Sequence, residues 1–459
     1  MTDRLLSVGL DVGTTTTQMI LSSIMVQNQA SGFAVPEMAI TQRQILYKSP
    51  VHFTPLKGGS LVDGEAIRTL VKQEYANAGI DRQQVDTGAI IITGETSRKE
   101  NASAVLQALS DYAGEFVVAT AGPDLESILA AKGAGAAEYS EKTGKTVLHM
   151  DIGGGTSNLS LLQEGKVVRT GCLNVGGRLL KLDQEGAVTY VSPVLKELTS
   201  IQMGDKPTKE QLAQVAKMLC SALEMAAGRI PETPLLQQLS TQEVQTAWKV
   251  PEGPVTVSFS GGVADCIAQD IPFLQFGDIG PILGKTIRES SLCSGDYVLG
   301  RETIRATVIG AGCHSTQLSG STVFSRGVVL PKKNLPVLAF SKWEQESADF
   351  SRLIADRLAM CDSLDAVLAI EGYESPDYRQ VSALAEKIAQ GVGDRPVYLC
   401  IQTDMAKALG QRLSLMLGER PCICLDRLKF PPESYLDIGA PVGPCFPVII
   451  KTLVLSNTQ

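Results

Sequence analysis

The pattern of hydrophobic and polar positions contains two pairs of short apolar runs. Within each pair, a segment rich in glycine and threonine separates the two runs. The first pair covers residues 5–10 and 18–24, and the second covers residues 146–150 and 159–162. Apolar runs of this length on both sides of a glycine segment are typical of two β-strands joined by a tight turn. The pattern therefore predicts two β-hairpins, one near the N-terminus and one about 140 residues later.

The two predicted turns share an order of residue types. The first reads DVGTTTT at residues 11–17, and the second reads DIGGGTSN at residues 151–158. Glycine lets the backbone approach an anion closely and frees N–H groups to point at it, and threonine hydroxyls add donors at the same place. The aspartates would then hold the counter-cation. One such hairpin could be an ordinary glycine-rich turn, but two of them indicate a phosphate clamp.

A third glycine signal, FSGGVADC at residues 259–266, is a predicted strand that ends in a glycine pair and is followed by a helical pattern. In this order the three motifs resemble the phosphate 1, phosphate 2 and adenosine motifs of the actin, Hsp70 and sugar-kinase ATPase superfamily. The resemblance implies an α/β protein with the actin/Hsp70-like ATPase fold, in which two RNase H-like lobes surround a nucleotide cleft. For the glycine pair alone, a plain turn is the alternative.

The rest of the chain alternates strands and helices, which is α/β organisation. Strands are predicted at residues 89–93, 115–119, 366–370, 397–401, 423–425 and 448–455. Helices are predicted at residues 97–112, 123–137, 208–228, 301–314, 378–390 and 405–417. We expect a first ATPase lobe at residues 1–145, a second lobe at 146–330 and an additional C-terminal α/β segment at 331–459.

Composition agrees with a large folded enzyme or chaperone. The 459 residues suggest about three domains or subdomains. Hydrophobic residues make up 44% and charged residues 20%, so a sizeable core is possible and no disorder signature is present. The net charge of −8 argues against a nucleic-acid partner. No apolar run approaches the roughly 18 residues that span a bilayer, and the N-terminus lacks a signal-peptide pattern, so we expect a cytoplasmic protein without a membrane partner.

The ten cysteines lie mostly in apolar surroundings, and we interpret them as reduced core residues rather than a disulfide framework. Cys422 and Cys424 have strand spacing that is expected to send their thiols to opposite faces, which disfavours a metal or iron–sulfur site there. The three histidines are not spaced as ligands. His149 lies in the strand before Asp151, where a core histidine with satisfied hydrogen bonds is expected rather than a catalytic base.

A helix rich in small residues is predicted just before the second hairpin. In the superfamily this place belongs to the connect 1 helix, which crosses at the hinge between the lobes, and small side chains permit such a close crossing. Asp124, in its first turn, would aim a carboxylate at the metal or the attacking water. The alternative for Asp124 is an acidic residue that stabilises the helix dipole. The helix at residues 301–314 would match connect 2.

Four blocks of the chain, at residues 11–23, 149–161, 259–266 and 435–455, together look like the bacterial ethanolamine ammonia-lyase reactivating factors, over essentially the full length. The C-terminal block YLDIGAPVGPCFPVIIKTLVL points to this family within the superfamily. The resemblance implies a chaperone-like ATPase that acts on ethanolamine ammonia-lyase, an adenosylcobalamin enzyme. With ATP and Mg²⁺ it would let damaged cobalamin leave the lyase and intact adenosylcobalamin enter. Homo-oligomers and association with a bacterial microcompartment are compatible with the family.

The resemblance also assigns the site. Asp11, Asp124 and Asp151 would be catalytic, and Asp11 and Asp151 would hold Mg²⁺ through water, which suits an ion that keeps most of its waters. The nucleotide would be bound by Gly13, Thr14, Thr15, Gly153, Gly154, Thr156, Gly261 and Gly262. Two positions depart from the Hsp70-like chaperones, namely Asn158, where they carry an acid, and Asp265, where they carry an arginine that stacks on adenine. The missing acid predicts slow hydrolysis that depends on the partner.

Two other classes of function use the same phosphate clamp. A small-molecule kinase of the sugar-kinase type would add an acidic base that activates an acceptor hydroxyl, and a rise in ADP release with acceptor would favour it. A non-enzymatic actin-like scaffold would bind ATP to assemble filaments, and nucleotide-dependent light scattering would reveal it. The sequence shows no identifiable acceptor site, so the reactivating ATPase is preferred.

Overall fold

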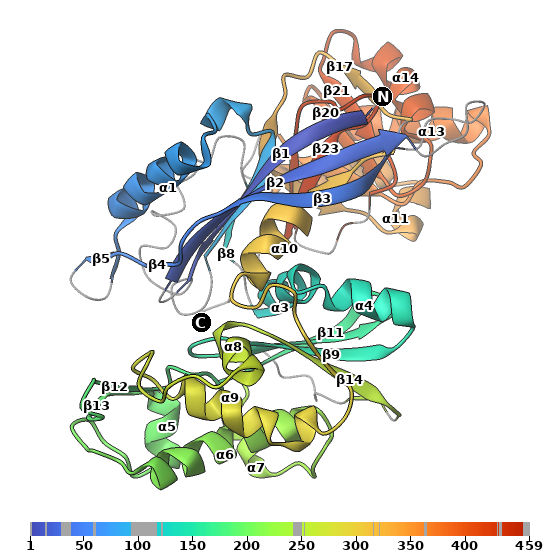
Figure 1. Cartoon of the computed structure of the whole chain (residues 1–459). Coiled ribbons are helices and arrows are strands. Elements are labelled where there is room, and N and C mark those ends of the chain that lie inside the picture. Colours follow the sequence, from blue (N-terminus) through green and yellow to red (C-terminus); the bar gives the residue numbers. More distant parts are fainter. Residues whose placement is uncertain are drawn as a thin grey trace.

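A computed structural model gives the fold of the chain. It describes residues 2–13, 16–28, 38–57, 61–92, 117–120, 123–241, 250–251, 253–314, 316–320, 322–361, 365–428, 430 and 434–452. Figure 1 shows two halves joined near helices α3 and α10. One half holds the N-terminal sheet in blue together with the C-terminal part in orange and red, and the other half holds the middle of the chain from teal to yellow.

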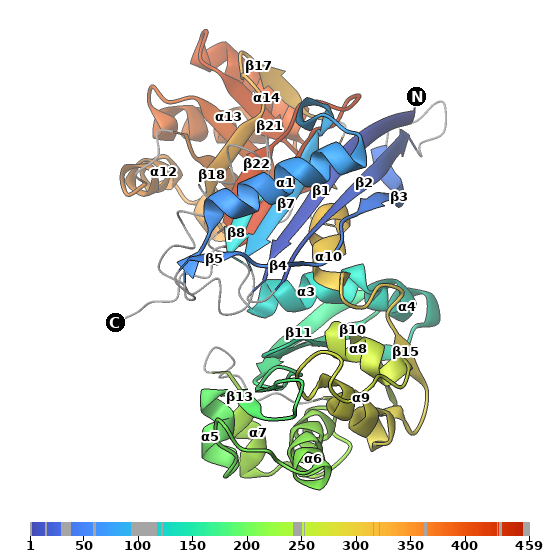
Figure 2. The same ribbon diagram turned by 60° about the vertical axis from the view of Figure 1, so that its left-hand side comes forward.

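The first sheet has the strand order β3-β2-β1-β7-β8. Strands β1 to β3 are antiparallel, and β7 and β8 run parallel to β1. The bounds are β1 Thr2–Val12, β2 Thr16–Asn28, β3 Met38–Lys48, β7 Thr87–Ile92 and β8 Val117–Thr120. Helix α1, Gly64–Ala78, covers one face (Figure 2), where alternate residues such as Val8 and Leu10 are buried against it. Asp63 caps the N-terminus of this helix, and Gly79 ends it in the left-handed region.

Three short strands and a single 3-10 turn lie beside this sheet. The bounds are β4 His52–Phe53, β5 Leu56–Lys57, β6 Leu61–Val62 and the turn Arg82–Gln84. Strand β4 pairs with the beginning of β2, so the segment after β3 returns to the first hairpin.

The second sheet repeats the order of the first, as β11-β10-β9-β14-β15. Again three strands are antiparallel, and β14 and β15 run parallel to β9. The bounds are β9 Thr146–Ile152, β10 Ser157–Gln163, β11 Lys166–Leu173, β14 Val255–Ser260 and β15 Tyr297–Leu299. This repeated topology confirms the predicted actin/Hsp70-like fold with two RNase H-like lobes.

Helices on one face of the second sheet share a large apolar core with β9 and β10. The bounds in this region are α5 Pro193–Leu198, α6 Lys209–Ala226, α7 Pro234–Leu239, α8 Gly262–Ala268, α9 Gly280–Arg288, the small strands β12 Leu180–Leu182 and β13 Val188–Val191, and the turn Ser291–Cys293. The opposite face of the sheet is covered by α3, Pro123–Gly133, and α4, Ala136–Thr143. None of the helices in the described part of the chain is long and apolar enough to cross a membrane.

Helices α3 and α10 cross where the two halves meet. Helix α10, Ala306–His314, packs on α3 and on strands β1, β2 and β7 of the first sheet. A Cβ atom placed on Gly133 would lie 1.8 Å from the carbonyl oxygen of Ala306, and one placed on Gly310 would lie 2.0 Å from that of Leu129. The two backbones therefore touch directly, and the predicted close crossing of small residues is confirmed.

The C-terminal part forms a third sheet with the order β16-β23-β22-β18-β19-β20-β21-β17. Its central strands β18 to β21 are parallel, with helices between them. The bounds are β16 Thr316–Leu318, β17 Phe324–Arg326, β18 Lys332–Ala339, α11 Lys342–Glu346, α12 Phe350–Ala359, β19 Val367–Ile370, α13 Tyr378–Val392, β20 Val397–Ile401, α14 Ala406–Leu417, β21 Cys422–Leu425, β22 Ser434–Ile438 and β23 Pro447–Thr452.

Most predicted elements agree with these bounds within a few residues, although α10 begins about five residues later than its apolar pattern suggested. The single helix predicted at residues 123–137 is instead two helices, α3 and α4, because the chain breaks at Gly135, which is in the left-handed region. The predicted helix at residues 97–112 lies outside the described residues, and the domain boundaries stay a prediction. The expectation for Cys422 and Cys424 is wrong. Their Sγ atoms lie 3.9 Å apart on one face of β21, because residues two apart on a strand share a face, and Ile423 points to the other.

Candidate functional site

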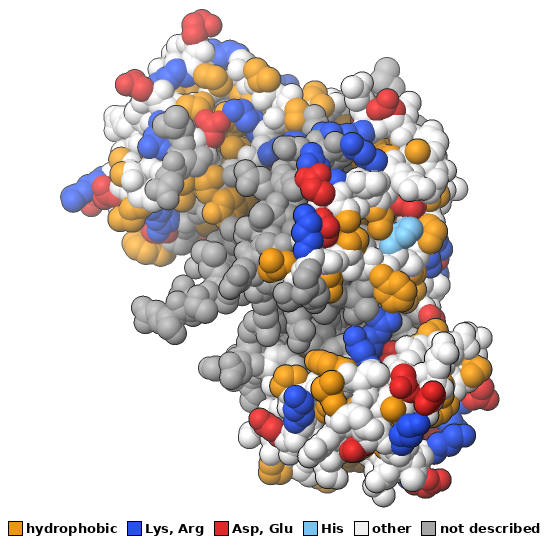
Figure 3. Space-filling view, turned by 90° about the vertical axis from the view of Figure 1, so that its left-hand side faces the viewer, with side chains coloured by type: hydrophobic (Ala, Val, Ile, Leu, Met, Phe, Trp, Pro, Cys, Tyr) orange, Lys and Arg blue, Asp and Glu red, His pale blue; other side chains and the backbone are white. Residues whose placement is uncertain are grey.

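The carboxyl ends of β1, β9 and β14 meet around the beginning of α10. Thr307, in the first turn of α10, hydrogen bonds to the carboxylate of Asp151 at the end of β9. The amide of Gln18, beside the end of β1, donates to the carbonyl oxygen of Ile304, 3.3 Å away. The structure thus brings both predicted aspartate turns and the predicted adenosine loop to one place beside the start of α10. Figure 3 shows the two halves of the molecule, one above the other, in a space-filling view.

The first hairpin is closed by its own backbone and supported by strand β4. The N–H of Gly13 donates to the carbonyl oxygen of Thr16 at 2.9 Å. Thr54, just after β4, donates its hydroxyl to the carbonyl oxygen of Gly13 at 2.8 Å and lies 3.1 Å from the hydroxyl of Thr17. Strand β4 therefore fixes the position of the turn that follows Asp11.

The second hairpin has the same closure and a buried carboxylate. The N–H of Gly153 donates to the carbonyl oxygen of Thr156 at 2.9 Å. Asp151 is 8% exposed and accepts a hydrogen bond from the hydroxyl of Ser260. Burial raises the pKa of Asp151 to about 6, against the opposing effect of the hydrogen bonds from Ser260 and Thr307. A cation beside Asp151 would favour its charged form.

His149 is a core residue, as predicted. Its two ring nitrogens lie 3.1 Å from the hydroxyl oxygen of Ser258 and 2.9 Å from that of Ser260. Burial lowers the pKa of His149 to about 3, so the ring is neutral at physiological pH. Through Ser260 it orients a donor to Asp151 rather than acting on a substrate.

An amide side chain stands opposite each site aspartate, which we did not anticipate from the sequence. Gln18 pairs with Asp11 across the first hairpin, and Asn158 pairs with Asp151 across the second. Both amides are at least 97% buried, and the carbonyl oxygen of each has no hydrogen-bond partner among the described residues. The signal was available, because directly opposite residues of an antiparallel pair share one face of the sheet.

A second glycine pair, Gly176 and Gly177, supports the second hairpin and was also missed. The N–H of Gly177 donates to the carbonyl oxygen of Gly153 at 3.1 Å, and the N–H of Arg178 donates to that of Gly154 at 2.6 Å. A Cβ atom on Gly176 would lie 2.4 Å from the carbonyl oxygen of Gly154. Only glycine permits this approach, and the sequence signal was the GG pair that begins three residues after the end of β11.

The predicted adenosine loop begins in a backbone conformation that is essentially reserved for glycine. Gly261 has φ +85°, and a Cβ atom there would lie 2.3 Å from the carbonyl oxygen of Ile152. Gly262 is open, since its nearest neighbour would be the Cδ1 atom of Ile304 at 4.0 Å. Asp265, on α8, accepts a hydrogen bond from the hydroxyl of Thr303.

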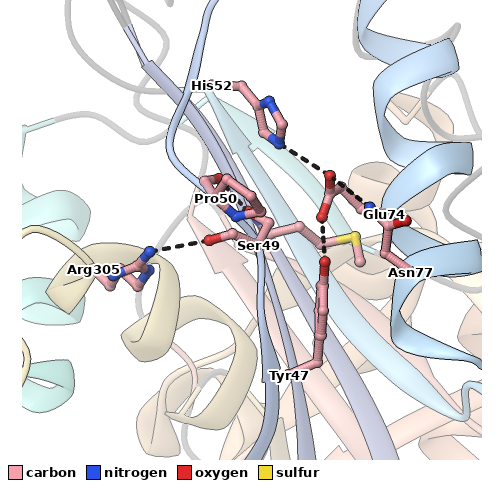
Figure 4. A network of polar contacts seen from close by, with 8 residues as sticks. Tyr47, Ser49, Pro50, His52, Glu74, Asn77 and Arg305 are labelled. Atoms are coloured by element: carbon pink, nitrogen blue, oxygen red, sulfur yellow. Dashed lines mark hydrogen bonds and ion pairs between the residues drawn. The ribbon is translucent and has the colours of Figure 1, made fainter.

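A polar network connects the first lobe to the beginning of α10 (Figure 4). Glu74 of α1 is 2% exposed and accepts from the hydroxyl of Tyr47 at 2.6 Å, with the Nε2 atom of His52 at 3.0 Å from its other oxygen. Between Tyr47 and His52, the carbonyl oxygen of Ser49 accepts from Arg305 at 3.0 Å. The segment that supports the first hairpin is thus held by α1 and by the residue before α10.

Some predicted site residues cannot be placed. Thr14 and Thr15 lie outside the described residues, and so does the side chain of Asp124, whose backbone lies in the first turn of α3. Among the described residues, no group of three or more His, Cys, Asp or Glu side chains could hold a metal ion.

Comparison with known proteins gives full-length relatives. The sequence profile of a family described as ethanolamine utilisation protein EutA matches residues 3–456. The protein named ethanolamine ammonia-lyase reactivase EutA from Escherichia coli (strain K12) is 39% identical over 474 aligned residues, covering 99% of this chain and 100% of that protein. The protein of the same name from Salmonella typhimurium is 39% identical with the same coverage.

Solved structures are more distant. The Aquifex aeolicus PPX-GPPA enzyme has a TM-score of 0.41 and 13% identity, covering 67% of this chain and 99% of that one. Ethanolamine utilization protein EutJ from Carboxydothermus hydrogenoformans has a TM-score of 0.33 and 14% identity, covering 67% of this chain and 88% of that one.

Proposed function

Because the chain belongs to the EutA family of ethanolamine utilisation proteins, we propose that it is an ATP-dependent reactivase of ethanolamine ammonia-lyase. The observation that carries the proposal is the 39% identity to two proteins of that name over essentially the whole of both chains. The convergence of two aspartate turns on the start of α10 supports the use of a nucleotide.

The residues around the site fit Mg²⁺·ATP. Glycine turns offer backbone N–H groups to phosphate, and Asp11 and Asp151 offer carboxylates to a hydrated divalent ion. The unpartnered carbonyl oxygens of Gln18 and Asn158 are buried beside these carboxylates. Buried acceptors of this kind cost free energy unless a donor reaches them, and water molecules held by a cation would be suitable donors. When bound, Mg²⁺ would supply charge compensation for the phosphates.

The work done with ATP is a change of conformation in the lyase. The contact between α3 and α10 is where the two lobes can turn relative to each other, and a nucleotide drives such motion through its different affinity for open and closed states. Lobe closure would alter the surface that grips the inactivated lyase, so that damaged cobalamin leaves and adenosylcobalamin enters. We place this activity in the cytoplasm. Attachment to a bacterial microcompartment and assembly into homo-oligomers are both compatible with it.

Release of cyanocobalamin from inactivated lyase tests the proposal. The lyase complex is incubated with this protein, with or without ATP and Mg²⁺, and the bound cobalamin is measured by absorbance after gel filtration. Release should need both ATP and Mg²⁺, and deamination of ethanolamine should return after adenosylcobalamin is added. Equal retention in all samples, with no recovered deamination, would overturn the proposal and favour a small-molecule kinase.

Variants of the two aspartates test the ATPase part separately. Asp11→Asn and Asp151→Asn should each lower ATP turnover by about 10- to 1000-fold, the range expected for losing an electrostatic element of a phosphoryl-transfer site. Folding should survive, because asparagine keeps an oxygen that accepts the hydrogen bond from Ser260 to residue 151. Near wild-type hydrolysis in both folded variants would contradict the assignment.

A further inference from the structure

Arg178 is a cation placed against the second hairpin, in a part of the site that the aspartates do not explain. Its backbone N–H donates to the carbonyl oxygen of Gly154. Its side chain lies along the same turn, since a Cβ atom on Gly154 would be 3.2 Å from the Cδ atom of Arg178. The side chain is 27% exposed, so it lies at the boundary between the turn and solvent.

The guanidinium is anchored by a buried carboxylate at the start of α9. Its Nε atom lies 3.3 Å from the Oδ2 atom of Asp278, and the Oδ1 atom of Asp278 accepts from the N–H of Gly280 at 2.8 Å. The side chain of Asp278 is 7% exposed, and this burial raises the pKa of its carboxyl. The hydrogen bond from Gly280 and the positive charge of Arg178 lower the same pKa, but by less. Arg178 therefore connects the second hairpin to the first turn of α9.

Donors remain on this guanidinium after the ion pair is made. An arginine carries five N–H groups in a planar fork, and the structure pairs only the Nε of Arg178 among the residues it describes. The two outer nitrogens can then bind a second anion while Nε still donates its hydrogen bond to Asp278. Such a fork matches the oxygens of a phosphate, with which arginine forms paired hydrogen bonds.

The charge of the surroundings indicates why a cation belongs there. Asp11, Asp151 and Asp278 are acidic, so an anionic ligand at this place needs positive charge beside it. Mg²⁺ would supply part of that charge, and the charge of Lys181 also acts on Asp278. The turn of residues 153–154 presents glycine backbone, and a Cβ atom placed on the neighbouring Gly177 would lie 2.9 Å from the Cα atom of Gly280. The backbone is therefore packed tightly here, and Arg178 is the cation that lies along the second hairpin.

We propose that Arg178 binds the phosphates of the nucleotide with its outer nitrogens while its Nε remains with Asp278. The assignment rests on the proposed function, because it takes ATP as the ligand of the two hairpins. Its consequence is that the phosphates are connected through Arg178 and Asp278 to the beginning of α9, on the far side of the second lobe from α3. Arg178 is then a nucleotide-binding residue that also positions α9.

Two variants with opposite expected results test the assignment. Arg178→Gln should weaken binding of Mg²⁺·ATP by about 10- to 100-fold in calorimetry, the effect of losing a charge-assisted pair of hydrogen bonds. Asp278→Asn removes a negative charge near the phosphates but keeps an acceptor for Gly280, so its ATP affinity should be unchanged or up to about tenfold higher. Arg352→Gln, on the exposed surface of α12, is the control for loss of one positive charge.

The outcomes separate the possibilities. If Arg178→Gln and Asp278→Asn lose ATP affinity by the same factor, the ion pair has only a structural role and the proposal is overturned. The proposal is also overturned if folded Arg178→Gln binds ATP within twofold of wild type. Should Arg178→Gln fail to fold, as judged by circular dichroism, Asp278→Asn still decides, because lower ATP affinity in that variant overturns the proposal, whereas unchanged or higher affinity supports it. Wild-type protein that binds no ATP would instead overturn the ATP premise of the proposed function, and this assignment with it.

Discussion

Replacing Gly261 with alanine tests whether the adenosine loop is held against the second hairpin as the structure shows. The added Cβ atom would lie 2.3 Å from the carbonyl oxygen, 2.6 Å from the carbonyl carbon and 2.7 Å from the nitrogen of Ile152. All three are backbone atoms of β9, so no side-chain rotation can relieve the contact. The end of β14 must therefore move away from the end of β9.

The expected cost has two parts. A residue with a Cβ atom at φ +85° and ψ 174°, a region that is essentially reserved for glycine, loses about 1–3 kcal/mol relative to glycine. Forcing an extra carbon into a well-packed place costs about 1–3 kcal/mol. Together these give a loss of about 2–6 kcal/mol in the free energy of unfolding. Because the shift occurs beside Asp151, binding of ATP should weaken by at least about tenfold.

Chemical unfolding followed by circular dichroism measures the stability, and titration calorimetry measures the affinity for Mg²⁺·ATP. Gly262→Ala is the matched control, because its new Cβ atom would have only the Cδ1 atom of Ile304 near it, at 4.0 Å. Its stability should stay within about 1 kcal/mol of wild type. Wild-type stability and ATP affinity in Gly261→Ala would refute the packing described for this loop.

Further predictions concern the nucleotide loop and three other places in the fold. Gly262→Val should weaken ATP binding in a folded protein, and unchanged affinity in calorimetry would mean that the glycine pair is only a turn. Burial raises the pKa of Asp86, so the folded state favours its proton, and the stability from this group is present below pH 3.8 and lost as the pH rises. Asp86→Asn should therefore be more stable than wild type in urea at pH 7, with a smaller difference below pH 3.8, where the carboxyl is protonated in both states, and a constant difference would contradict this. Glu74→Ala, which removes a buried acceptor from the partly buried hydroxyl of Tyr47, should lower the free energy of unfolding by about 1–3 kcal/mol, whereas Glu74→Gln should lose less. Burial raises the pKa of the Cys400 thiol, so its alkylation at pH 8 should be slow until denaturant is added, as mass spectrometry can show.

The sequence predicted the parts of the site that depend on a local pattern. The turns after Asp11 and Asp151 were identified because apolar strands and glycines are adjacent in the chain, and the fold confirms both hairpins. Thr54 was missed, because it acts through a contact with Gly13, 41 residues away, and nothing in its own neighbourhood indicates the contact. Arg178 was missed together with the glycine pair that precedes it, which makes the same contact with the second hairpin.

The error at Cys422 and Cys424 has a different cause. Successive side chains of a strand point to opposite faces, so residues two apart share a face. The spacing of the two cysteines in the sequence therefore already indicated that their thiols lie on the same side. The roles given to Asp124, Thr14 and Thr15 stay predictions, because they depend on side chains that the structure does not describe.

The backbone contact of α3 and α10 limits how the lobes can move. Helices whose side-chain ridges interlock resist rotation against each other. At Gly133 and Gly310, by contrast, the two backbones touch without a side chain between them. Rotation about this contact is therefore easier than sliding, since sliding would press Leu129 or Ala306 into a neighbour that has no room for it. Because this contact lies near the site, a small rotation there displaces the outer ends of the lobes by a larger distance than it displaces the residues beside the phosphates. A large partner bound to those ends would therefore undergo the largest displacement, although it lies far from the nucleotide.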